Sequence, residues 1–410
     1  MMRCRHCGST EFIPFLDLGE APPSNSYLEA ADLTQPEKRY PLVIRTCTAC
    51  WLTQTEDFAD REEFFSGDYA YFSSFSKTWL DHARAYVETM RDRFGLGPES
   101  LVAEVAANDG YLLQYVRELG IPCYGIEPTR STAEAARTRG IEIVEDFFGR
   151  ELAGKLADQG RQADLIAANN VLAHVPDIND FAGGFAELLK PTGVATFEFP
   201  HLYEMVRGNQ FDTAYHEHYS YLSLLAVDRI FSANGLTVFD IETTPHHGGS
   251  LRVFVCRSDF ATHQVTSAVK AMLDTEREAG MNDQAFYSGF QASAEASRDG
   301  FRAFLAEARK SGLKVAAYGA AAKGNTLLNF AGADAGDIAF VVDRNPAKQG
   351  RYMPGSHIPI VGEDRLLSDR PDRVVILPWN IETEIRSQLA YISDWGGQFV
   401  TAIPTLQTRS

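Results

Sequence analysis

The chain has 410 residues, of which 45% are hydrophobic and 23% are charged. This length exceeds what one hydrophobic core usually supports, so the sequence predicts a folded globular protein of two or three domains. The formal net charge of -17 argues against nucleic acid or an anionic membrane as a partner, although a local basic pocket can still bind an anionic small molecule.

No apolar run reaches the roughly 18 residues of a transmembrane helix, and the N-terminal stretch MMRCRHCGST lacks the apolar centre of a secretory signal. We therefore expect a cytoplasmic protein. No apolar coiled-coil seam is visible, which favours a monomer.

Four of the six cysteines form two C-x-x-C pairs, Cys4 with Cys7 and Cys47 with Cys50. A structural zinc ion takes four thiolates in a tetrahedron, and each pair supplies two of them. In a cytoplasmic chain this spacing favours zinc over disulfides, with a redox pair or free thiols as the alternatives. We expect His6, inside the first pair, to be a neighbour of the metal and not a ligand.

Two contrasting segments belong to this first domain. Residues 16–30, LDLGEAPPSNSYLEA, are rich in turn residues and predict a surface loop. Residues 64–79, FFSGDYAYFSSFSKTW, are dense in aromatic side chains and hydroxyl groups. They predict either a packed connector or a lid over a pocket.

Strand-like and helix-like segments alternate through the middle of the chain. The pattern predicts strands within residues 101–110, 123–128, 141–148, 163–175 and 194–200, and helices within 111–120, 130–140 and 181–193. Such alternation is typical of a parallel sheet with helices on both faces. The sequence therefore predicts an α/β domain here.

Polar side chains follow the expected strands, and ligands of such sheets bind at the carboxyl ends of the strands. Glu127 ends the second strand and suits the two hydroxyl groups of a ribose, although a solvated strand end would look the same. The loop from Glu104 to Gly110, EVAANDG, has one glycine where the dinucleotide fingerprint has three. S-adenosylmethionine has no phosphate to cradle, so the loop favours it over a nicotinamide cofactor.

Residues 212–222, DTAYHEHYSYL, crowd two histidines, a glutamate and three tyrosines together. Histidine titrates near neutral pH and suits a general base, which a carboxylate such as Glu217 can orient. His216 and His218 could instead chelate a metal, but no third ligand lies at a recognisable spacing. A plain structural turn with inert histidines is the third interpretation.

The last third of the chain predicts helices over about 262–310 and then a second parallel α/β unit. Its loop 318–326, YGAAAKGNT, opens a helix and suits a phosphate, with Lys323 adding a charge, although a tight turn has the same composition. His247 lies in HHGGSLRV, where a tight turn and a substrate contact are both consistent with the glycines.

Taken together, these motifs resemble the S-adenosylmethionine-dependent C-methyltransferases that act on nucleotide-linked keto-deoxysugars in antibiotic pathways. The motifs that carry the resemblance, in chain order, are the two cysteine pairs, EVAANDGYLLQ, GIEP, DFF, AANNVLAHVPD, FDTAYHEHYSYLS, HHGGSLRV, AYGAAAKGNT, DRNPAKQGRYMPGSHIPI and LPWN. The resemblance covers nearly the whole chain. It implies a zinc-binding N-terminal domain over 1–76, a class I methyltransferase Rossmann-like core over 77–245 and a C-terminal Rossmann-like domain over 246–410.

The resemblance also implies an activity, namely methylation of the C3 carbon beside the C4 ketone of a dTDP-linked sugar. His218 is then the base, with Tyr215, Glu217 and His174 beside it and Tyr71 closing over the site. The residues expected to hold the cofactor are Glu104, Ala106, Asn108, Gly110, Glu127, Pro128, Asp146, Phe147 and Asn169. Those expected to meet the sugar nucleotide are Tyr69, Phe72, Asn170, His247 and Lys323.

Two positions depart from the family pattern. His216 stands where the family has an acidic residue, and Ala106 stands where many methyltransferases have glycine, which we expect to be tolerable if its φ angle is negative. Two other functions are consistent with the same sequence: methylation of a keto compound that is not a sugar, and a silent protein that only binds nucleotide and adenosyl ligands.

Overall fold

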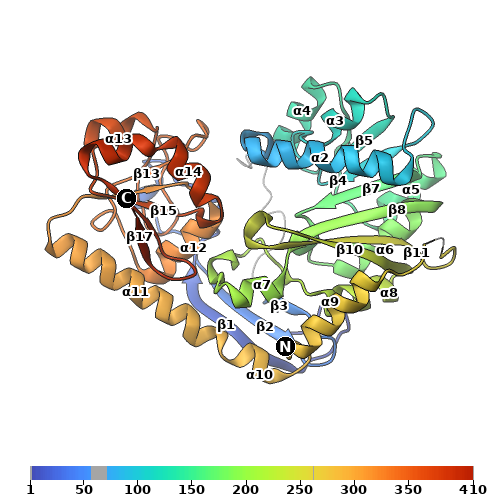
Figure 1. Ribbon diagram of the computed structural model, residues 1–410, viewed down its shortest axis with the longest axis horizontal. Helices are drawn as coiled ribbons and strands as arrows, with labels where there is room; N and C mark the ends of the chain where they lie inside the picture. Colours follow the sequence, from blue (N-terminus) through green and yellow to red (C-terminus); the bar gives the residue numbers. More distant parts are fainter. Residues whose placement is uncertain (1, 57–71, 262, 410) are drawn as a thin grey trace.

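The chain folds around three β-sheets, which lie in three successive regions of a computed structural model describing residues 2–56, 72–261 and 263–409. In Figure 1 the C-terminal sheet and the seven-stranded middle sheet lie side by side, and strands β1 and β2 of the N-terminal sheet run below them. This arrangement brings the N-terminal sheet into contact with both of the other domains.

The N-terminal sheet is antiparallel, with the order β1-β2-β3-β9. Its strands are β1 (Phe12–Ala21), β2 (Tyr40–Cys47), β3 (Thr53–Thr55) and β9 (Ser220–Tyr221), and a 3-10 helix, η1 (Asp32–Thr34), lies in the β1–β2 connection. The loop predicted for residues 16–30 is therefore wrong over its first six residues, because β1 continues to Ala21. Burial alternates from Ile13 to Phe15 and again from Leu16 to Leu18, on either side of a register shift, and the strand continues through Gly19 to Ala21.

The middle sheet has seven strands in the order β6-β5-β4-β7-β8-β11-β10. Its strands are β4 (Val102–Val105), β5 (Cys123–Ile126), β6 (Glu142–Val144), β7 (Ala163–Asn169), β8 (Leu189–Pro200), β10 (Leu236–Thr244) and β11 (Ser250–Arg257). Its helices are α2 (Lys77–Phe94), α3 (Leu113–Glu118), α4 (Arg130–Thr138), α5 (Arg150–Asp158), α6 (Ile178–Leu188), α7 (Leu202–Arg207) and α8 (Leu224–Ala233). The first five strands are parallel in the order 3-2-1-4-5, which confirms the predicted Rossmann-like core.

Strands β10 and β11 complete this sheet as an antiparallel pair, with β11 lying against β8. The predicted domain limit after residue 245 falls between them, so the sheet continues across that limit to Arg257. The connection holds a short 3-10 helix, η5 (His246–Gly248). Three further 3-10 helices flank the same region of the core: η2 (Ser73–Phe75), η3 (Leu172–His174) and η4 (Phe211–Thr213).

The C-terminal domain also has a parallel sheet that ends in an antiparallel strand. Its strand order is β14-β13-β12-β15-β16-β17, and only β17 is antiparallel. Its strands are β12 (Val315–Tyr318), β13 (Val341–Val342), β14 (Ile360–Val361), β15 (Arg373–Ile376), β16 (Gln398–Thr401) and β17 (Gln407–Arg409). Its helices are α9 (Ser267–Glu278), α10 (Gln284–Ser288), α11 (Phe290–Lys310), α12 (Ala322–Ala331), α13 (Asp364–Asp369) and α14 (Glu382–Gln388), with 3-10 turns η6 (Trp379–Ile381) and η7 (Ala390–Trp395). This confirms the predicted second Rossmann-like unit.

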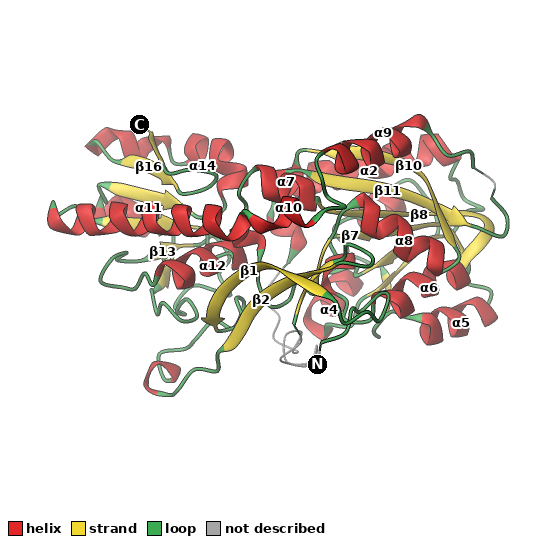
Figure 2. Cartoon of the chain, turned by 90° about the horizontal axis from the view of Figure 1, so that it is seen from below, coloured by secondary structure: helices red, strands yellow, loops and turns green. Residues whose placement is uncertain are grey.

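One continuous hydrophobic core joins the N-terminal sheet to the C-terminal domain. Phe15 of β1 stacks on Phe290 of α11 with 4.7 Å between ring centroids, and it meets Tyr287 edge-on. Figure 2 shows α11 running along the C-terminal domain and α10 continuing its line toward the middle domain, above β1 and β2. None of the helices described here combines the length and apolar character needed to cross a membrane.

Candidate active site and zinc centre

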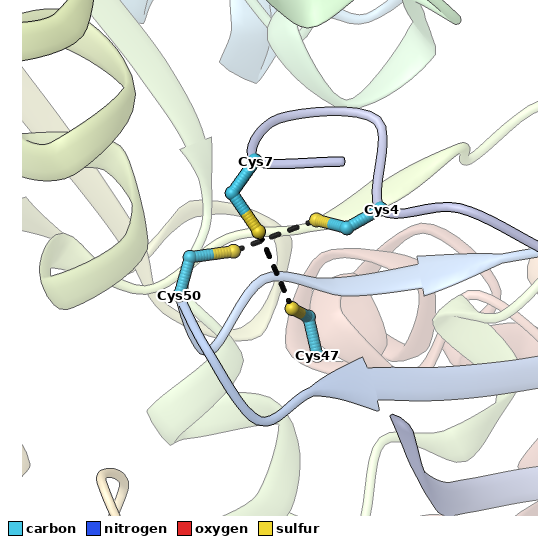
Figure 3. Close-up of side chains that lie close together, drawn as sticks. All are labelled: Cys4, Cys7, Cys47 and Cys50. Carbon is cyan, nitrogen blue, oxygen red and sulfur yellow. Dashed lines mark hydrogen bonds between the residues drawn. The ribbon is translucent and has the colours of Figure 1, made fainter. Parts of the chain in front are cut away.

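The four predicted zinc ligands gather at the N-terminal end of the chain (Figure 3). The Sγ atoms of Cys4 and Cys50 lie 3.5 Å apart, and those of Cys7 and Cys47 lie 3.6 Å apart. Four thiolates around zinc at about 2.3 Å stand roughly 3.8 Å from one another, whereas disulfide sulfurs are only about 2.0 Å apart. The donor set therefore fits a tetrahedral zinc ion.

The cysteine cluster also fastens the N-terminal domain to the core. Gln54 donates to Cys4 Sγ at 3.3 Å, and Arg5 donates to the Pro176 carbonyl at 3.0 Å, across the domain boundary. The Nδ1 atom of His6 lies 2.9 Å from Oδ1 of Asn179, so this ring points to the core and is a neighbour of the metal site, as expected.

The predicted cofactor residues lie at the carboxyl ends of the parallel strands. Glu104 is the penultimate residue of β4 and is completely buried, with the Tyr111 hydroxyl as the hydrogen-bonding group beside its carboxylate. Burial raises the pKa of Glu104 well above its ordinary value. A buried carboxyl group of this kind has further acceptor capacity and could also accept from the ammonium group of an amino-acid ligand.

Glu127 ends β5, and its carboxylate joins two backbone segments. It accepts hydrogen bonds from the N–H groups of Asn108 and Thr129, both at 2.9 Å, while burial raises its pKa. Pro128 lies between Glu127 and Thr129 in this turn. Asn169 ends β7, where its Oδ1 is buried without a hydrogen-bond partner among the described residues.

The loop after β4 has left-handed backbone at three alternate residues, Ala106 (φ 59°), Asn108 (φ 48°) and Gly110 (φ 77°). The condition under which an alanine at position 106 was expected to be tolerable, a negative φ, is therefore not met. A Cβ at Gly110 would also crowd the Cδ1 atom of Ile141, and the left-handed φ itself favours glycine there. The loop has the backbone of a G-x-G-x-G turn although only its last position is glycine.

Asp146 and Phe147 follow β6, two strands away from β4 at the edge of the sheet. Asp146 is exposed, and its Oδ1 accepts a hydrogen bond from the Phe147 N–H at 2.8 Å. Phe147 is half-buried, so an exposed polar group and a ring face lie together at this strand end.

The stretch 212–222 brings His218 and Tyr215 into direct contact. The Tyr215 hydroxyl lies 2.5 Å from His218 Nε2, and His218 Nδ1 lies 2.9 Å from the Thr213 carbonyl. A carbonyl can only accept, so Nδ1 carries the proton and Nε2 accepts from the tyrosine. Burial, and then the nearby His174, hold the pKa of His218 well below its usual value, so the imidazole is neutral at neutral pH.

Two further titratable residues near this stretch, His174 and Glu217, have different neighbours. The ring of His174 meets that of His218 edge-on at 4.6 Å, and burial lowers the pKa of His174 to about 4. Glu217 instead accepts from Asn25 Nδ2 at 3.1 Å, and burial raises its pKa to about 7. The partner of the His218 Nδ1 is thus Thr213 and not the Glu217 carboxylate, contrary to the expected orienting contact.

The metal interpretation of HEH is not supported by the geometry. His216 Nε2 turns to the Tyr40 carbonyl, 3.1 Å away in the N-terminal sheet, while His218 faces Tyr215. Among the described residues, these two histidines belong to no cluster of three metal-ligating side chains.

Three predicted substrate residues meet where the two Rossmann-like domains touch. Asn170 Nδ2 lies 3.1 Å from His247 Nε2, and Lys323 Nζ donates to the His247 carbonyl at 3.2 Å. Asn170 and His247 both have left-handed backbone, at φ 53° and 56°. Burial lowers the pKa of Lys323, and the carboxylate of Asp212 raises it.

Phe72, half-buried, meets Phe75 edge-on, whereas Tyr69 and Tyr71 lie outside the described residues.

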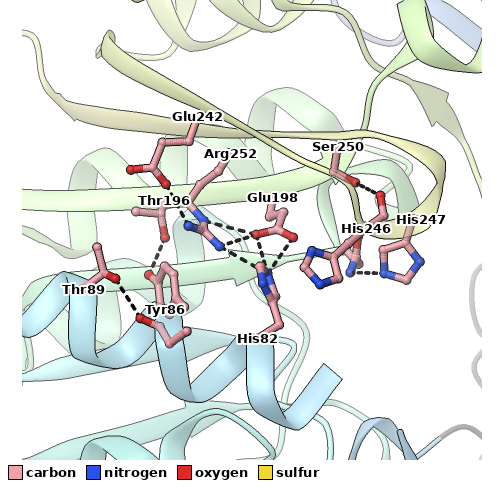
Figure 4. Close-up of polar contacts among 12 residues, drawn as sticks. His82, Tyr86, Thr89, Thr196, Glu198, Glu242, His246, His247, Ser250 and Arg252 are labelled. Atoms are coloured by element: carbon pink, nitrogen blue, oxygen red, sulfur yellow. Dashed lines mark hydrogen bonds and ion pairs between the residues drawn. The ribbon is translucent and has the colours of Figure 1, made fainter. Parts of the chain in front are cut away.

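A buried charge network lies beside His247 (Figure 4). Arg252 Nη2 lies 2.7 Å from Glu198 Oε2 and 3.2 Å from His82 Nε2, and His82 Nε2 lies 2.9 Å from Glu198 Oε1. His246 packs on His82 with 3.9 Å between ring centroids. His82, Glu198 and His246 could ligate a metal, but the Arg252 guanidinium already supplies the positive charge at that point.

The sequence reasoning missed several residues of this region. The Trp379 indole donates to Asp212 Oδ2 at 2.8 Å, which ties η6 to η4 across the domains. Asn325 on α12 is buried with both amide atoms unpartnered in the described chain, and Thr326 beside it donates to the Ala214 carbonyl at 2.7 Å. Both Asn325 and Thr326 stood in the GNT motif, but only contacts between distant segments could single them out.

Family models match three consecutive parts of the chain. The zinc binding domain model matches residues 4–65, the methyltransferase domain model matches 80–241, and the C-methyltransferase C-terminal domain model matches 245–404. The limit between the last two models falls at the end of β10, so β11 of the middle sheet lies within the match of the C-terminal model.

Known proteins match over very different lengths. Over 401 residues the chain is 34% identical to the C-methyltransferase NovU of Streptomyces niveus, covering 98% of this chain and 95% of that protein. A ubiquinone biosynthesis O-methyltransferase of Chelativorans sp. (strain BNC1) is 33% identical over 94 residues, 23% of this chain and 37% of its own. The crystal structure of magnesium protoporphyrin IX methyltransferase from Synechocystis PCC 6803 with bound SAH is 14% identical, covers 44% of this chain and 83% of its own, and has a TM-score of 0.35. The whole-length match to NovU shows that the chain belongs to the family of S-adenosylmethionine-dependent C-methyltransferases with an N-terminal zinc-binding domain.

Proposed function

We propose that this enzyme methylates the C3 carbon beside the C4 ketone of a dTDP-linked keto-deoxysugar in natural-product biosynthesis. The observation that carries the proposal is the pair of Tyr215 and His218, in which Nε2 is the unprotonated nitrogen. Methylation at carbon needs a base for a weakly acidic C–H group, whereas methylation of an ionised oxygen does not. The resemblance of the whole motif set to sugar C-methyltransferases supports the sugar as acceptor.

His218 is the final proton acceptor in this scheme. Its Nδ1–H donates to the Thr213 carbonyl, which fixes the tautomer and stabilises the imidazolium once Nε2 is protonated. Tyr215 is more exposed than His218 and passes a proton to Nε2 as its own oxygen takes one from C3 of the sugar. The electron pair of the C3–H bond forms a double bond between C3 and C4 of the sugar, and the π pair of the ketone leaves negative charge on its oxygen.

The His174 imidazole would lie beside that oxygen as it becomes negative, because its ring meets that of His218 with 4.6 Å between centroids. Burial lowers its pKa to about 4, so the ring is neutral, and it would exchange its hydrogen bond with the Glu217 carbonyl for one with the oxygen. Bound S-adenosylmethionine supplies an electrophilic methyl group at this point. Glu104, Glu127 and Asn169 would hold its methionine and ribose parts, and Asp146 and Phe147 would flank its adenine.

The diphosphate of the substrate would meet the N-terminal end of α12. Ala321 caps this ten-residue helix without a side-chain acceptor, so its first N–H groups could donate to a phosphate. Lys323 lies in the first turn, and an anion there would offset the cost of its buried charge. Asn170 and His247 would then lie beside the sugar.

Calorimetric titration tests the substrate class directly. We expect S-adenosylhomocysteine and thymidine diphosphate to bind at separate, saturable sites, and we expect Lys323→Met to weaken only the second. Binding of the first ligand alone would reject the nucleotide-sugar substrate and leave a different keto compound as the acceptor. Binding of neither by folded protein would reject the whole proposal.

A further inference from the structure

The segment just before α2 is bonded directly to the cofactor loop that follows β4. The backbone N–H of Ser73 donates to Oδ1 of Asn108 at 2.9 Å. The next residue, Ser74, donates from its hydroxyl to Oδ2 of Asp109, and its N–H lies 3.4 Å from the same oxygen. Two consecutive residues of η2 therefore bind two consecutive residues of the loop.

Asn108 connects three parts of the site through different atoms. Its backbone N–H donates to Glu127, its Oδ1 accepts from Ser73, and its φ of 48° is left-handed. Glycine would adopt this φ without strain, but it has no side chain to reach Ser73. Asparagine is the residue type that tolerates left-handed backbone and still offers an acceptor.

Arg139 strengthens the same junction from the end of α4. Its Nη2 donates to the Ser74 hydroxyl at 2.9 Å, and its Nη1 donates to the Asp109 carbonyl. Asp109 is only 1% exposed, whereas Ser74 and Arg139 are half-buried, so losing these contacts would leave a buried carboxylate with fewer donors.

We propose that Asn108, Asp109, Ser74 and Arg139 are positioning residues that lock η2 onto the cofactor loop, and that this lock holds the loop in the shape that binds S-adenosylmethionine. The loop needs such support because Ala106, two residues away, occupies left-handed backbone without glycine. A loop held in its bound shape binds its ligand more tightly because less order remains to be imposed. Binding and docking of η2 are therefore coupled, and each strengthens the other.

Two substitutions separate this coupling from simple backbone strain. Asn108→Gly relaxes the left-handed backbone but removes the acceptor for Ser73, so strain alone predicts equal or tighter cofactor binding. The lock predicts weaker binding of S-adenosylhomocysteine by about five- to tenfold, the effect of one ordinary hydrogen bond. Ser74→Ala should weaken binding similarly, and Ser74→Thr, which keeps the hydroxyl, should restore it.

Calorimetry measures these affinities, and hydrogen exchange of the amides at 72–76 provides a second readout. We expect S-adenosylhomocysteine to slow this exchange in the wild type and to slow it much less in Asn108→Gly. The proposal is overturned if both Asn108→Gly and Ser74→Ala bind S-adenosylhomocysteine with unchanged affinity. It is also overturned if the ligand does not change the rate of amide exchange at 72–76. A wild-type protein that fails to bind S-adenosylhomocysteine overturns it as well, whereas failure to bind thymidine diphosphate bears only on the substrate proposed above.

Discussion

The indole N–H of Trp379 donates to Oδ2 of Asp212 across the two Rossmann-like domains, although 167 residues separate them in the chain. Asp212 is fully buried, and Lys323 lies close enough to lower its pKa in opposition to burial. This contact connects η6 with the segment that carries Tyr215 and His218. The relative position of the two domains is thereby tied to the proposed base.

Asp212→Asn should therefore change how stability depends on pH. Burial raises the pKa of Asp212 to about 6, above its ordinary value of 3.8. The folded protein therefore holds this proton more tightly than the unfolded chain does. The resulting contribution to the free energy of unfolding is fully present below about pH 4 and is lost as pH rises through 6. The side-chain amide of the Asp212→Asn variant still accepts from Trp379, but it does not titrate, so the variant does not lose free energy of unfolding over this pH range. We expect its free energy of unfolding, relative to wild type, to rise between pH 4 and 7 by at most about 3 kcal/mol. Denaturant titrations at several pH values measure this, and a difference independent of pH would refute it.

Arg252→Met should destabilise the core sheet strongly. It leaves the Glu198 carboxylate buried without its guanidinium partner, which typically costs about 3–5 kcal/mol. The matched control is Arg277→Met, because Arg277 forms a surface pair with Asp274 and such pairs contribute less than about 1 kcal/mol. Burial alone would raise the pKa of Glu198, but His82 and Arg252 outweigh it and lower the pKa to about 2. The contribution of this network to the free energy of unfolding is therefore fully present above about pH 4.5 and is lost as pH falls toward 2. Equal effects of the two substitutions would contradict this assignment.

Cys47→Ser should release zinc and loosen the N-terminal domain. A metal site with three thiolates binds zinc more weakly, and the turn that carries Cys4 also carries Arg5, which docks on the core at the Pro176 carbonyl. We expect about one zinc per chain in the wild type and clearly less in the variant, measured by elemental mass spectrometry. Cys123→Ser lies outside the cluster and should leave the zinc content unchanged. A wild type without zinc would count against the site.

Ala106→Gly should stabilise the protein. An alanine at φ 59° is strained by roughly 1–2 kcal/mol, and glycine removes that strain at a smaller cost in unfolded-state entropy. We expect the free energy of unfolding to rise by about 0.5–1 kcal/mol. Its neighbour Ala107 is fully buried without left-handed backbone, so Ala107→Gly should destabilise instead. Thermal or chemical unfolding of the two variants compares them directly, and a loss of stability in Ala106→Gly would show that its backbone is not strained.

The alternation of strands and helices predicted both Rossmann-like domains, because parallel strands carry apolar runs such as VAAY in β12 and VVI in β15. The same logic located Glu104, Glu127 and Asn169, since the end of a strand can be read from the sequence. The pairing of Asp212 with Trp379 could not be predicted, because it depends on how two domains dock. The left-handed backbone of Ala106 was hidden for a similar reason: alanine rarely adopts it, so composition pointed the other way.

The placement of residues 212–222 was also beyond the sequence. Their crowded polar side chains suggested one catalytic loop, yet the structure distributes them among three neighbours. His218 faces Tyr215, His216 faces the Tyr40 carbonyl, and Glu217 faces Asn25. Which neighbour each side chain meets depends on β9 joining the N-terminal sheet, a pairing of only two residues that carries no local signal.

Proton removal by Tyr215 and His218 can be measured separately from methyl transfer, and this tests the proposed mechanism most directly. The protein, saturated with S-adenosylhomocysteine, is incubated in D₂O with a dTDP-4-keto-deoxysugar, and deuterium at C3 is followed by mass spectrometry. We predict rapid incorporation by the wild type and a rate about 100- to 10,000-fold lower in His218→Asn, with S-adenosylhomocysteine affinity unchanged. Equal incorporation by the two proteins would contradict a base role for His218.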